Sequence, residues 1–476
     1  MNPTSLPADP VPIRRGRWRL LALVMSVLAA FAAAYFTKDA TPSPTTVEAA
    51  KPAGKTATEI LADIPAAASG SDTDRALAKG ISRVTATPEK ARGWVDLGDL
   101  LAQKMRDTSN PVFYEHAASA YAQALTIELQ NADAMTGMAW VAGGRHLFDE
   151  SVGWANKALS TDPEHIGATG IIGDAALELG DYDKAFEFYQ KMMDLRPDLS
   201  SWSRGAHLLW LTGDKMKGVW LMEKAIRAGA PFGENTAWCR ANLAMMHFQA
   251  GALLPAQQVL EPALQTDSRN PHVLMAAARI AAAKLDYPAV FGFCGTLLEA
   301  GPHHDALVLK GNLHAIAGDA AKAEECYQQV EKLHAATEAK GGHDHMQMAR
   351  YYADHDRNLV VALRMAEEHK LTKNVLEADV LAWVYFKNGN LERAAAAIKT
   401  ALSENTPDAE MRYHAGMIAA AEGKTQVARK HLQQALGQNP QFNVLQAPIA
   451  RRTLEILSGA DAAAAGNAAA TAPGIR

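Results

Sequence analysis

Residues 169–197 read TGIIGDAALELGDYDKAFEFYQKMMDLRP, and this stretch decides the fold. Small residues lie four and sixteen places after its first position, at Gly173 and Ala185. A Gly180-Asp181 pair marks a turn between them, and Pro197 ends the segment, because proline cannot continue a helix. The pattern predicts two antiparallel helices that cross closely, since a close crossing accepts no side chain larger than alanine.

The same pattern recurs along the chain with a period near 34 residues. The equivalent first positions are Trp94, Met135, Thr169, Trp202, Arg240, Val273, Leu307, Met346, Ala378 and Arg412. Small residues occupy the crossing position in all ten second helices and in nine of the ten first helices, where Arg350 is the exception. We therefore predict ten repeats over residues 91–442, with a break near residues 334–345.

This pattern resembles the tetratricopeptide repeat (TPR), in which W-x2-L-G-x2-Y is followed by A-x3-F, then A, then P. The resemblance covers residues 91–442 and implies an all-α fold, an α-α superhelix of about ten helix pairs. It also implies a concave surface, lined by the first helices, that binds protein partners. The sequence departs from the pattern in the first repeat, which carries an insertion, and in the eighth, which lacks a clean turn glycine.

Candidate groove residues are those first-helix side chains that escape packing within their own repeat. They include aromatic and arginine side chains, which often carry the binding energy of protein interfaces. The candidates are Trp140, Arg204, Trp238, Phe248, Asn312, Trp383, Phe386, Tyr413 and Met417. The alternative interpretation is that these large side chains form the core between adjacent repeats.

One TPR subclass captures a partner's C-terminal carboxylate with a Lys-x3-Asn clamp. Asn312 matches the asparagine of that clamp, but Val308 stands where the lysine should be. The clamp is incomplete, so we do not expect binding of a chaperone tail.

The N-terminal region predicts a membrane anchor. Residues 20–36, LLALVMSVLAAFAAAYF, are long enough at about 1.5 Å per residue to cross most of a bilayer core. Residues 1–19 form a short basic segment, and the positive-inside rule places it in the cytoplasm. The body then lies outside the cytoplasm, in the periplasm if the protein is bacterial. The alternative is a signal peptide cleaved near residues 32–34.

Four further segments complete the predicted organisation. Residues 37–57 are a flexible linker rich in Pro, Thr and Ala, and residues 58–90 are a helical lead-in. Residues 443–457 supply a C-terminal capping helix, which a solenoid needs at its exposed end. Residues 458–476 are rich in Ala and Gly without a pattern, and predict a disordered tail.

Histidines gather in the middle of the chain, where half of the 16 lie in the segment 303–369. Because neutral imidazoles are common metal ligands, His343 and His345 are candidate metal ligands, and a periplasmic metal-handling role is an alternative function. Solvated loop histidines are the simpler interpretation, and we predict no cofactor. Cys294 and Cys326 fall in second helices of adjacent repeats, where buried free thiols are favoured over a disulfide.

The remaining features exclude several classes of protein. The formal net charge of −5 over 476 residues gives no basic face for nucleic acid. No HExxH, G-x-S-x-G, P-loop or dinucleotide fingerprint is present, so no enzyme is predicted. The sequence therefore predicts a non-catalytic, membrane-tethered, extracytoplasmic TPR scaffold that binds protein partners. A regulatory subunit of a partner enzyme is a further alternative.

Overall fold

The computed structural model of the chain describes residues 55–65, 70–108, 110–229, 233–339, 345–368 and 373–470. The chain divides into two units, Met1–Gly54 and Lys55–Arg476, of which only the second is described. The predicted anchor at residues 20–36 and the candidate ligand His343 therefore lie outside the described residues. Within the described part of the chain, no helix combines the length and the apolar character that a membrane span requires.

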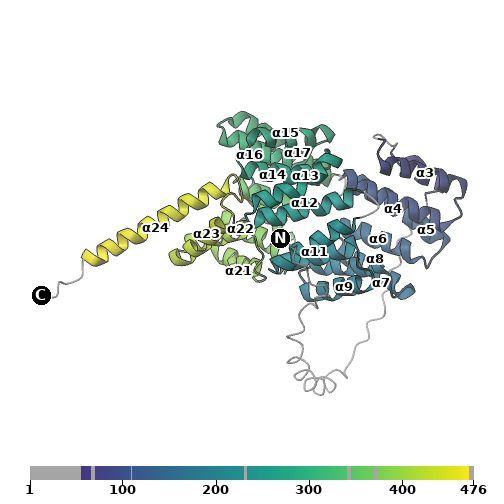
Figure 1. The fold of residues 1–476 in the computed structure, drawn as a ribbon, viewed down its shortest axis with the longest axis horizontal. Helices are drawn as coiled ribbons and strands as arrows, with labels where there is room; N and C mark the ends of the chain where they lie inside the picture. Colours follow the sequence, from purple (N-terminus) through teal and green to yellow (C-terminus); the bar gives the residue numbers. More distant parts are fainter. Residues whose placement is uncertain are drawn as a thin grey trace, which may run out of the picture. The chain divides into compact units, whose positions relative to one another are not determined.

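Ten antiparallel helix pairs follow one another between Ala91 and Gln438, as the spacing of the repeats predicts. Two lead-in helices precede them, α2 (Ala57–Asp63) and α3 (Asp72–Ala86). The pairs are α4 (Ala91–Thr108) with α5 (Val112–Ile127), α6 (Ala132–Gly144) with α7 (Phe148–Thr161), α8 (Ile166–Glu178) with α9 (Tyr182–Leu195), α10 (Leu199–Leu211) with α11 (Lys215–Ala228), α12 (Gly233–Gln249) with α13 (Leu253–Thr266), α14 (Pro271–Ala283) with α15 (Tyr287–Ala300), α16 (His304–Ile316) with α17 (Ala320–Glu338), α18 (His345–Asp354) with α19 (Leu359–Glu368), α20 (Val375–Lys387) with α21 (Leu391–Ala401), and α22 (Ala409–Ala421) with α23 (Thr425–Gln438). The fold is an all-α helical-repeat solenoid (Figure 1).

The core is continuous across the predicted break near residues 334–345. One cluster of buried side chains joins Tyr327 and Val330 of α17 to Met348 and Tyr351 of α18. Repeat 8 departs from the pattern in another way, because α18 and α19 have only 10 residues each. The irregular spacing in the sequence thus marks short helices, and packing continues on both sides of them.

Close helix crossings explain the small residues of the repeat. The ring of Tyr121 on α5 lies between Gly98 on α4 and Gly137 on α6. A Cβ atom at Gly98 would come within 2.5 Å of that ring, and one at Gly137 within 2.3 Å. The Tyr121 hydroxyl donates a hydrogen bond to Asp99 Oδ1 at 2.8 Å. Glycine at these two positions therefore lets one aromatic ring join three helices.

Alanine at Gly137 is expected to lower the free energy of unfolding by about 1–3 kcal/mol, because the added methyl group overpacks the Tyr121 ring. The same change at Gly153 on α7, where a Cβ would meet nothing within 4 Å, should instead raise it by about 0.5–1 kcal/mol. Urea unfolding followed by circular dichroism compares the two variants. Equal effects at both positions would contradict the packing explanation.

The superhelix closes on itself through three equivalent contacts. The turns at Gly180, Gly213 and Gly251, within repeats 3, 4 and 5, adopt positive φ angles of 73°, 84° and 79°. Their backbones lie against loops that follow the second helices of repeats 8, 9 and 10, at residues 373–374, 404–405 and 438–439. Figure 1 shows α22 near α12, and Gln249 at the end of α12 donates to Asp408 at the start of α22 at 3.2 Å.

A polar side chain bridges each of these contacts. Asn374 donates to the Glu178 carbonyl at 3.1 Å, across 196 residues of sequence. Thr406 donates to the Leu211 carbonyl at 2.6 Å and Asn439 to the Phe248 carbonyl at 2.8 Å, across 195 and 191 residues. All three acceptors lie at or near the C-terminal end of a first helix, where carbonyls lack a partner within the helix. These contacts enclose the inner face of the solenoid.

The C-terminal helix α24 (Gln446–Ala470) begins within the predicted cap and continues past it. Ala447 and Ala450 are fully buried against the last repeats, as a cap requires. The helix does not end at residue 457, so the expectation of a patternless tail from residue 458 is wrong as far as Ala470. The alanine run explains the difference, because alanine has the highest intrinsic helix propensity.

Candidate partner-binding surface

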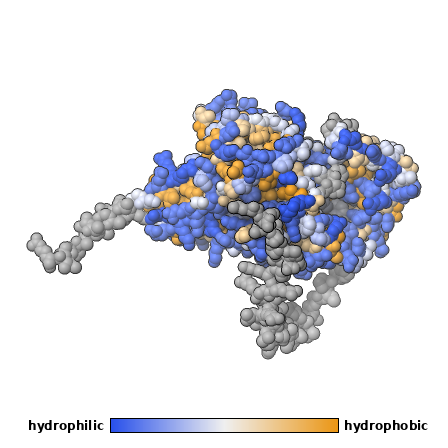
Figure 2. Space-filling view, viewed as in Figure 1, coloured by the Kyte–Doolittle hydropathy of each residue, from blue (hydrophilic) through white to orange (hydrophobic). Residues whose placement is uncertain are grey.

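Two cavities lie on the inner face of the solenoid. The large cavity has a volume of about 1280 Å³ and is lined mainly by first helices from α4 to α18. The small cavity, of about 500 Å³, lies between α12, α14 and α16 on one side and α18, α22 and the start of α24 on the other. His304 and Gln347 line both cavities, so the two adjoin at these side chains. The face of the molecule seen in Figure 2 is mostly hydrophilic, with apolar areas among the hydrophilic ones.

Aromatic side chains and an arginine gather in the large cavity. The rings of Tyr114 and Trp140 have centroids 5.3 Å apart, and the Arg106 guanidinium lies 5.4 Å from the Trp140 ring. Burial lowers the pKa of Arg106, while the nearby Glu234 carboxylate opposes this shift. Trp238 of α12 lines the same cavity. These residue types dominate the binding energy of many protein interfaces.

Arg204 on α10 is held in place at the wall of the large cavity. Its Nε and NH2 atoms donate to both carboxylate oxygens of Asp174, at 2.8 and 2.9 Å. The hydroxyl of Tyr189 donates to the same carboxylate at 2.8 Å. Burial opposes the charge on Arg204, but Asp174 outweighs it and raises the pKa of Arg204. The Arg204 guanidinium is therefore charged, and Asp174 fixes its direction.

The structure brings together five of the nine predicted groove residues. Trp140, Arg204 and Trp238 line the large cavity, and Phe248 and Asn312 line the small one. The other four, Trp383, Phe386, Tyr413 and Met417, are not among the residues that line these cavities and pack in or against the core. Trp383 and Tyr413 are buried, so for them the core interpretation replaces the groove interpretation, whereas Phe386 and Met417 are half-buried against the core and stay predictions.

The physical reason is the stacking of aromatic rings between the last repeats. Trp383 and Tyr413 are only 3% and 2% exposed. The Trp383 ring stacks on His414 with centroids 4.2 Å apart, and its indole N–H donates to Asp354 at 2.9 Å. The Phe386 ring also stacks on Trp383, with ring centroids 4.9 Å apart. Aromatic residues on a first helix therefore do not all face the groove.

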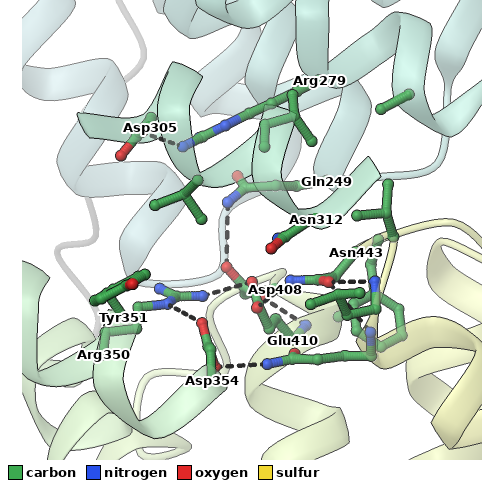
Figure 3. A pocket seen from close by; sticks show the side chains of 18 of the residues that line it. Gln249, Arg279, Asp305, Asn312, Arg350, Tyr351, Asp354, Asp408, Glu410 and Asn443 are labelled. Atoms are coloured by element: carbon green, nitrogen blue, oxygen red, sulfur yellow. Dashed lines mark hydrogen bonds and ion pairs between the residues drawn. The ribbon is translucent and has the colours of Figure 1, made fainter. Parts of the chain in front are cut away.

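The repeat pattern in the sequence does not predict the charged residues of the small cavity. Arg350 replaces a small residue at a crossing position, and its guanidinium points into the cavity, 2.6 Å from Glu410 and 3.8 Å from Asp354 (Figure 3). Asn443 donates to Glu410 at 2.9 Å, and Gln249 donates to Asp408 at 3.2 Å. The break in the small-residue pattern at Arg350 was the one signal of this network in the sequence.

The rim of the large cavity carries a pH-sensitive carboxyl. Burial, and then the charges of Glu377 and Asp174, raise the pKa of Glu178 to about 7 from its ordinary value of 4.5. Between these two pH values the folded state binds more protons than the unfolded state, so stability falls as pH rises.

The Glu178→Gln variant is therefore expected to be more stable than the parent above pH 7, and the difference should vanish towards pH 4.5. Neighbouring protein atoms crowd the Glu178 carboxyl, but the residue as a whole stays accessible to solvent at the cavity rim, so screening limits the gain to less than about 1 kcal/mol. Thermal unfolding at a series of pH values measures it. A variant with the same stability as the parent at every pH would contradict the raised pKa of Glu178.

The chemistry of the histidines and cysteines is limited in the described residues. His345 lies between two carboxylates, with Nδ1 2.8 Å from Glu368 and Nε2 3.3 Å from Glu338. Across the described ranges, no group of three or more His, Cys, Asp or Glu side chains is arranged to hold a metal ion. Cys239, Cys294 and Cys326 are buried free thiols, and burial raises the pKa of Cys294 to about 11.

Family models described as tetratricopeptide repeats match residues 170–199 and 380–441. The chain thus contains tetratricopeptide repeats in these two segments.

Curated relatives match part of the chain. It is 27% identical over 115 residues to the cytochrome c-type biogenesis protein CycH of Pseudomonas aeruginosa, covering 24% of this chain and 27% of that protein. It is 28% identical over 116 residues to the formate-dependent nitrite reductase complex subunit NrfG of Escherichia coli O157:H7, covering 24% of this chain and 55% of that protein. The matched part thus spans about a quarter and about half of these relatives.

Solved structures show distant likeness. Pseudomonas aeruginosa pilF matches 44% of this chain and 90% of its own, with 18% identity and a TM-score of 0.34. A chain of the APC/C hetero-tetramer Cut9-Hcn1 matches 81% of this chain and 93% of its own, with 12% identity and a TM-score of 0.35.

Proposed function

We propose that this chain is a non-catalytic scaffold that binds a segment of a partner protein along its inner face. The observation that carries the proposal is the large cavity, in which Trp140, Tyr114, Arg106 and Trp238 lie near a fixed Arg204. Its volume of about 1280 Å³ exceeds the usual range for small-molecule sites, which reaches about 1000 Å³. A polypeptide segment with aromatic or acidic groups fits such a surface.

The proposal extends to topology. The apolar run at residues 20–36 and the arginines before it favour a chain tethered to the membrane with its repeats outside the cytoplasm. A scaffold held in this way meets its partners at the membrane surface. Full-length protein should stay with membranes after a carbonate wash, and release into the soluble fraction would contradict the tether.

The names of the two curated relatives support a role in the biogenesis of a protein complex. One relative is named for cytochrome c-type biogenesis and the other as a subunit of a nitrite reductase complex. We accordingly propose that the partner belongs to the assembly of c-type cytochromes. Deleting the gene in its host should abolish covalently bound haem on gels of membrane proteins, and the wild-type gene should restore it. Unchanged haem staining would contradict this assignment.

A further inference from the structure

Carboxylates outnumber cations in the small cavity. Among the described residues that line it, Arg279 and Arg350 are the arginines, and the acidic side chains are Asp305, Glu377, Asp354, Asp408 and Glu410. Arg279 pairs with Asp305 at 2.5 Å and Arg350 pairs with Glu410 at 2.6 Å. Figure 3 shows Arg279 with Asp305 on one side of the cavity, and Arg350, Asp354, Asp408 and Glu410 on the other. Asp354 and Asp408 therefore add negative charge beyond the two closest ion pairs.

A buried acceptor at the same place lacks a donor. Gln446 is only 4% exposed and lines the small cavity. Its Nε2 donates to Asp354 at 2.7 Å, which leaves Oε1 as the free end of the amide. No donor within the described residues reaches that Oε1 atom. Because an unsatisfied buried acceptor is destabilising, the site gains from a ligand that brings a hydrogen-bond donor.

The rest of the wall is apolar. Met275, Leu309, Val380 and Phe442 line the space beside the carboxylates. A small hydrated ion gains nothing from such a wall, whereas the methylene stem of a long cation packs against it. The ligand must then combine a cationic hydrogen-bond donor with an apolar stem.

We propose that the small cavity binds an alkylammonium or guanidinium group on an apolar stem, supplied by a lysine or arginine side chain of the partner segment. The partner is the favoured source because His304 and Gln347 line both cavities, so a segment in the large cavity lies beside the small one. This source rests on the proposed function. The cation site itself does not, because it is defined by Asp354, Asp408 and Gln446.

The protonation of these carboxyls supports the same ligand. Burial raises the pKa of Asp354 to about 6, with Arg350 and His414 opposing and Glu410 adding to the shift. Burial, and then the charges of Glu410 and Asp379, raise the pKa of Asp408 to about 6 against the effect of Arg350. A cation binds the ionised forms, so its affinity should increase as the pH rises from 5 to 7.

Calorimetric titration of the full-length protein in detergent tests the site. The three titrants are Nα-acetyl-lysine methylamide, butylamine and the uncharged Nα-acetyl-norleucine methylamide. We expect the two cations to bind and the norleucine compound not to bind. Asp354→Asn and Asp408→Asn should each weaken binding about tenfold or more, since hydrogen bonds to charged groups contribute about 1.5–3 kcal/mol. Asparagine at 408 still caps α22, because it is as good an N-cap as aspartate.

Two further variants separate this site from a general charge effect. Arg350→Gln frees the Glu410 carboxylate and should strengthen binding of the cations. Asp183→Asn, at an exposed carboxylate on α9, should leave it unchanged. Thermal unfolding identifies any variant that fails to fold. Equal binding by all folded variants, or no binding of the lysine compound, would overturn the proposal.

The outcomes distinguish this proposal from the scaffold function. A partner that binds while the lysine compound does not would overturn the cation site and leave the scaffold standing. If the lysine compound binds but no partner protein binds at the large cavity, the scaffold function would be overturned and the cation site would stand. Butylamine that binds at least about tenfold tighter than the lysine compound would overturn the partner segment as the source of the cation.

Discussion

Alanine in place of Gly251 is expected to open the contact between the fifth repeat and the C-terminal repeats. The residue has a φ of 79°, which costs a non-glycine residue about 1–2 kcal/mol. Its Cβ would also lie 2.2 Å from the Gln438 carbonyl oxygen, and such overpacking costs about 1–3 kcal/mol more. The two costs together predict a loss of about 2–5 kcal/mol in the free energy of unfolding.

Gly318 provides the matched control. It occupies the same kind of turn in repeat 7, with a φ of 80°, but a Cβ there would meet nothing within 4 Å. Gly318→Ala should therefore cost only the backbone term of about 1–2 kcal/mol.

Hydrogen exchange by mass spectrometry measures the opening locally, which suits a repeat protein whose parts unfold separately. Gly251→Ala should speed exchange around residues 438–443, and Gly318→Ala should not. Identical exchange in the two variants would show that the superhelix does not close through this contact.

Replacing Trp140 and Trp238 together by alanine is expected to weaken partner binding by at least about a hundredfold. Interface tryptophans that act as hot spots contribute about 2 kcal/mol or more each, and every 1.4 kcal/mol is a factor of ten. Both side chains line the large cavity, and Trp140 also holds the Arg106 guanidinium.

Trp154→Ala is the control, because Trp154 lies on the second helix α7 and is not among the residues that line either cavity. Affinity for the purified partner, measured by biolayer interferometry, should decrease in the double variant and stay unchanged in the control. A double variant that binds as tightly as the parent would remove the large cavity from the binding surface.

The repeat pattern predicts what is local and misses what is long-range. Small residues, turn glycines and helix-ending prolines act within about 34 residues, so the ten helix pairs follow from them. The contacts of Asn374, Thr406 and Asn439 join residues more than 190 positions apart. They depend on the curvature accumulated over several repeats, which no single repeat encodes.

The same limit applies to the groove residues. Trp140 and Trp383 occupy comparable places on first helices, yet one lines a cavity and the other is buried. The difference lies in the neighbour, since His414 and Tyr413 of the following repeat cover Trp383. Arg350 was visible as an exception to the pattern, but its partner Glu410 could be identified only from the folded chain.

Site-specific crosslinking tests the central claim, that the inner face binds a protein segment, most directly. The photoreactive residue p-benzoylphenylalanine is placed at Trp238 on the inner face, or at Trp154 on an outer helix, in full-length protein made by the host cell. A discrete adduct with one protein should form from position 238, should disappear with Trp140→Ala, and should be absent from position 154. An adduct that forms only from position 154 would contradict the claim.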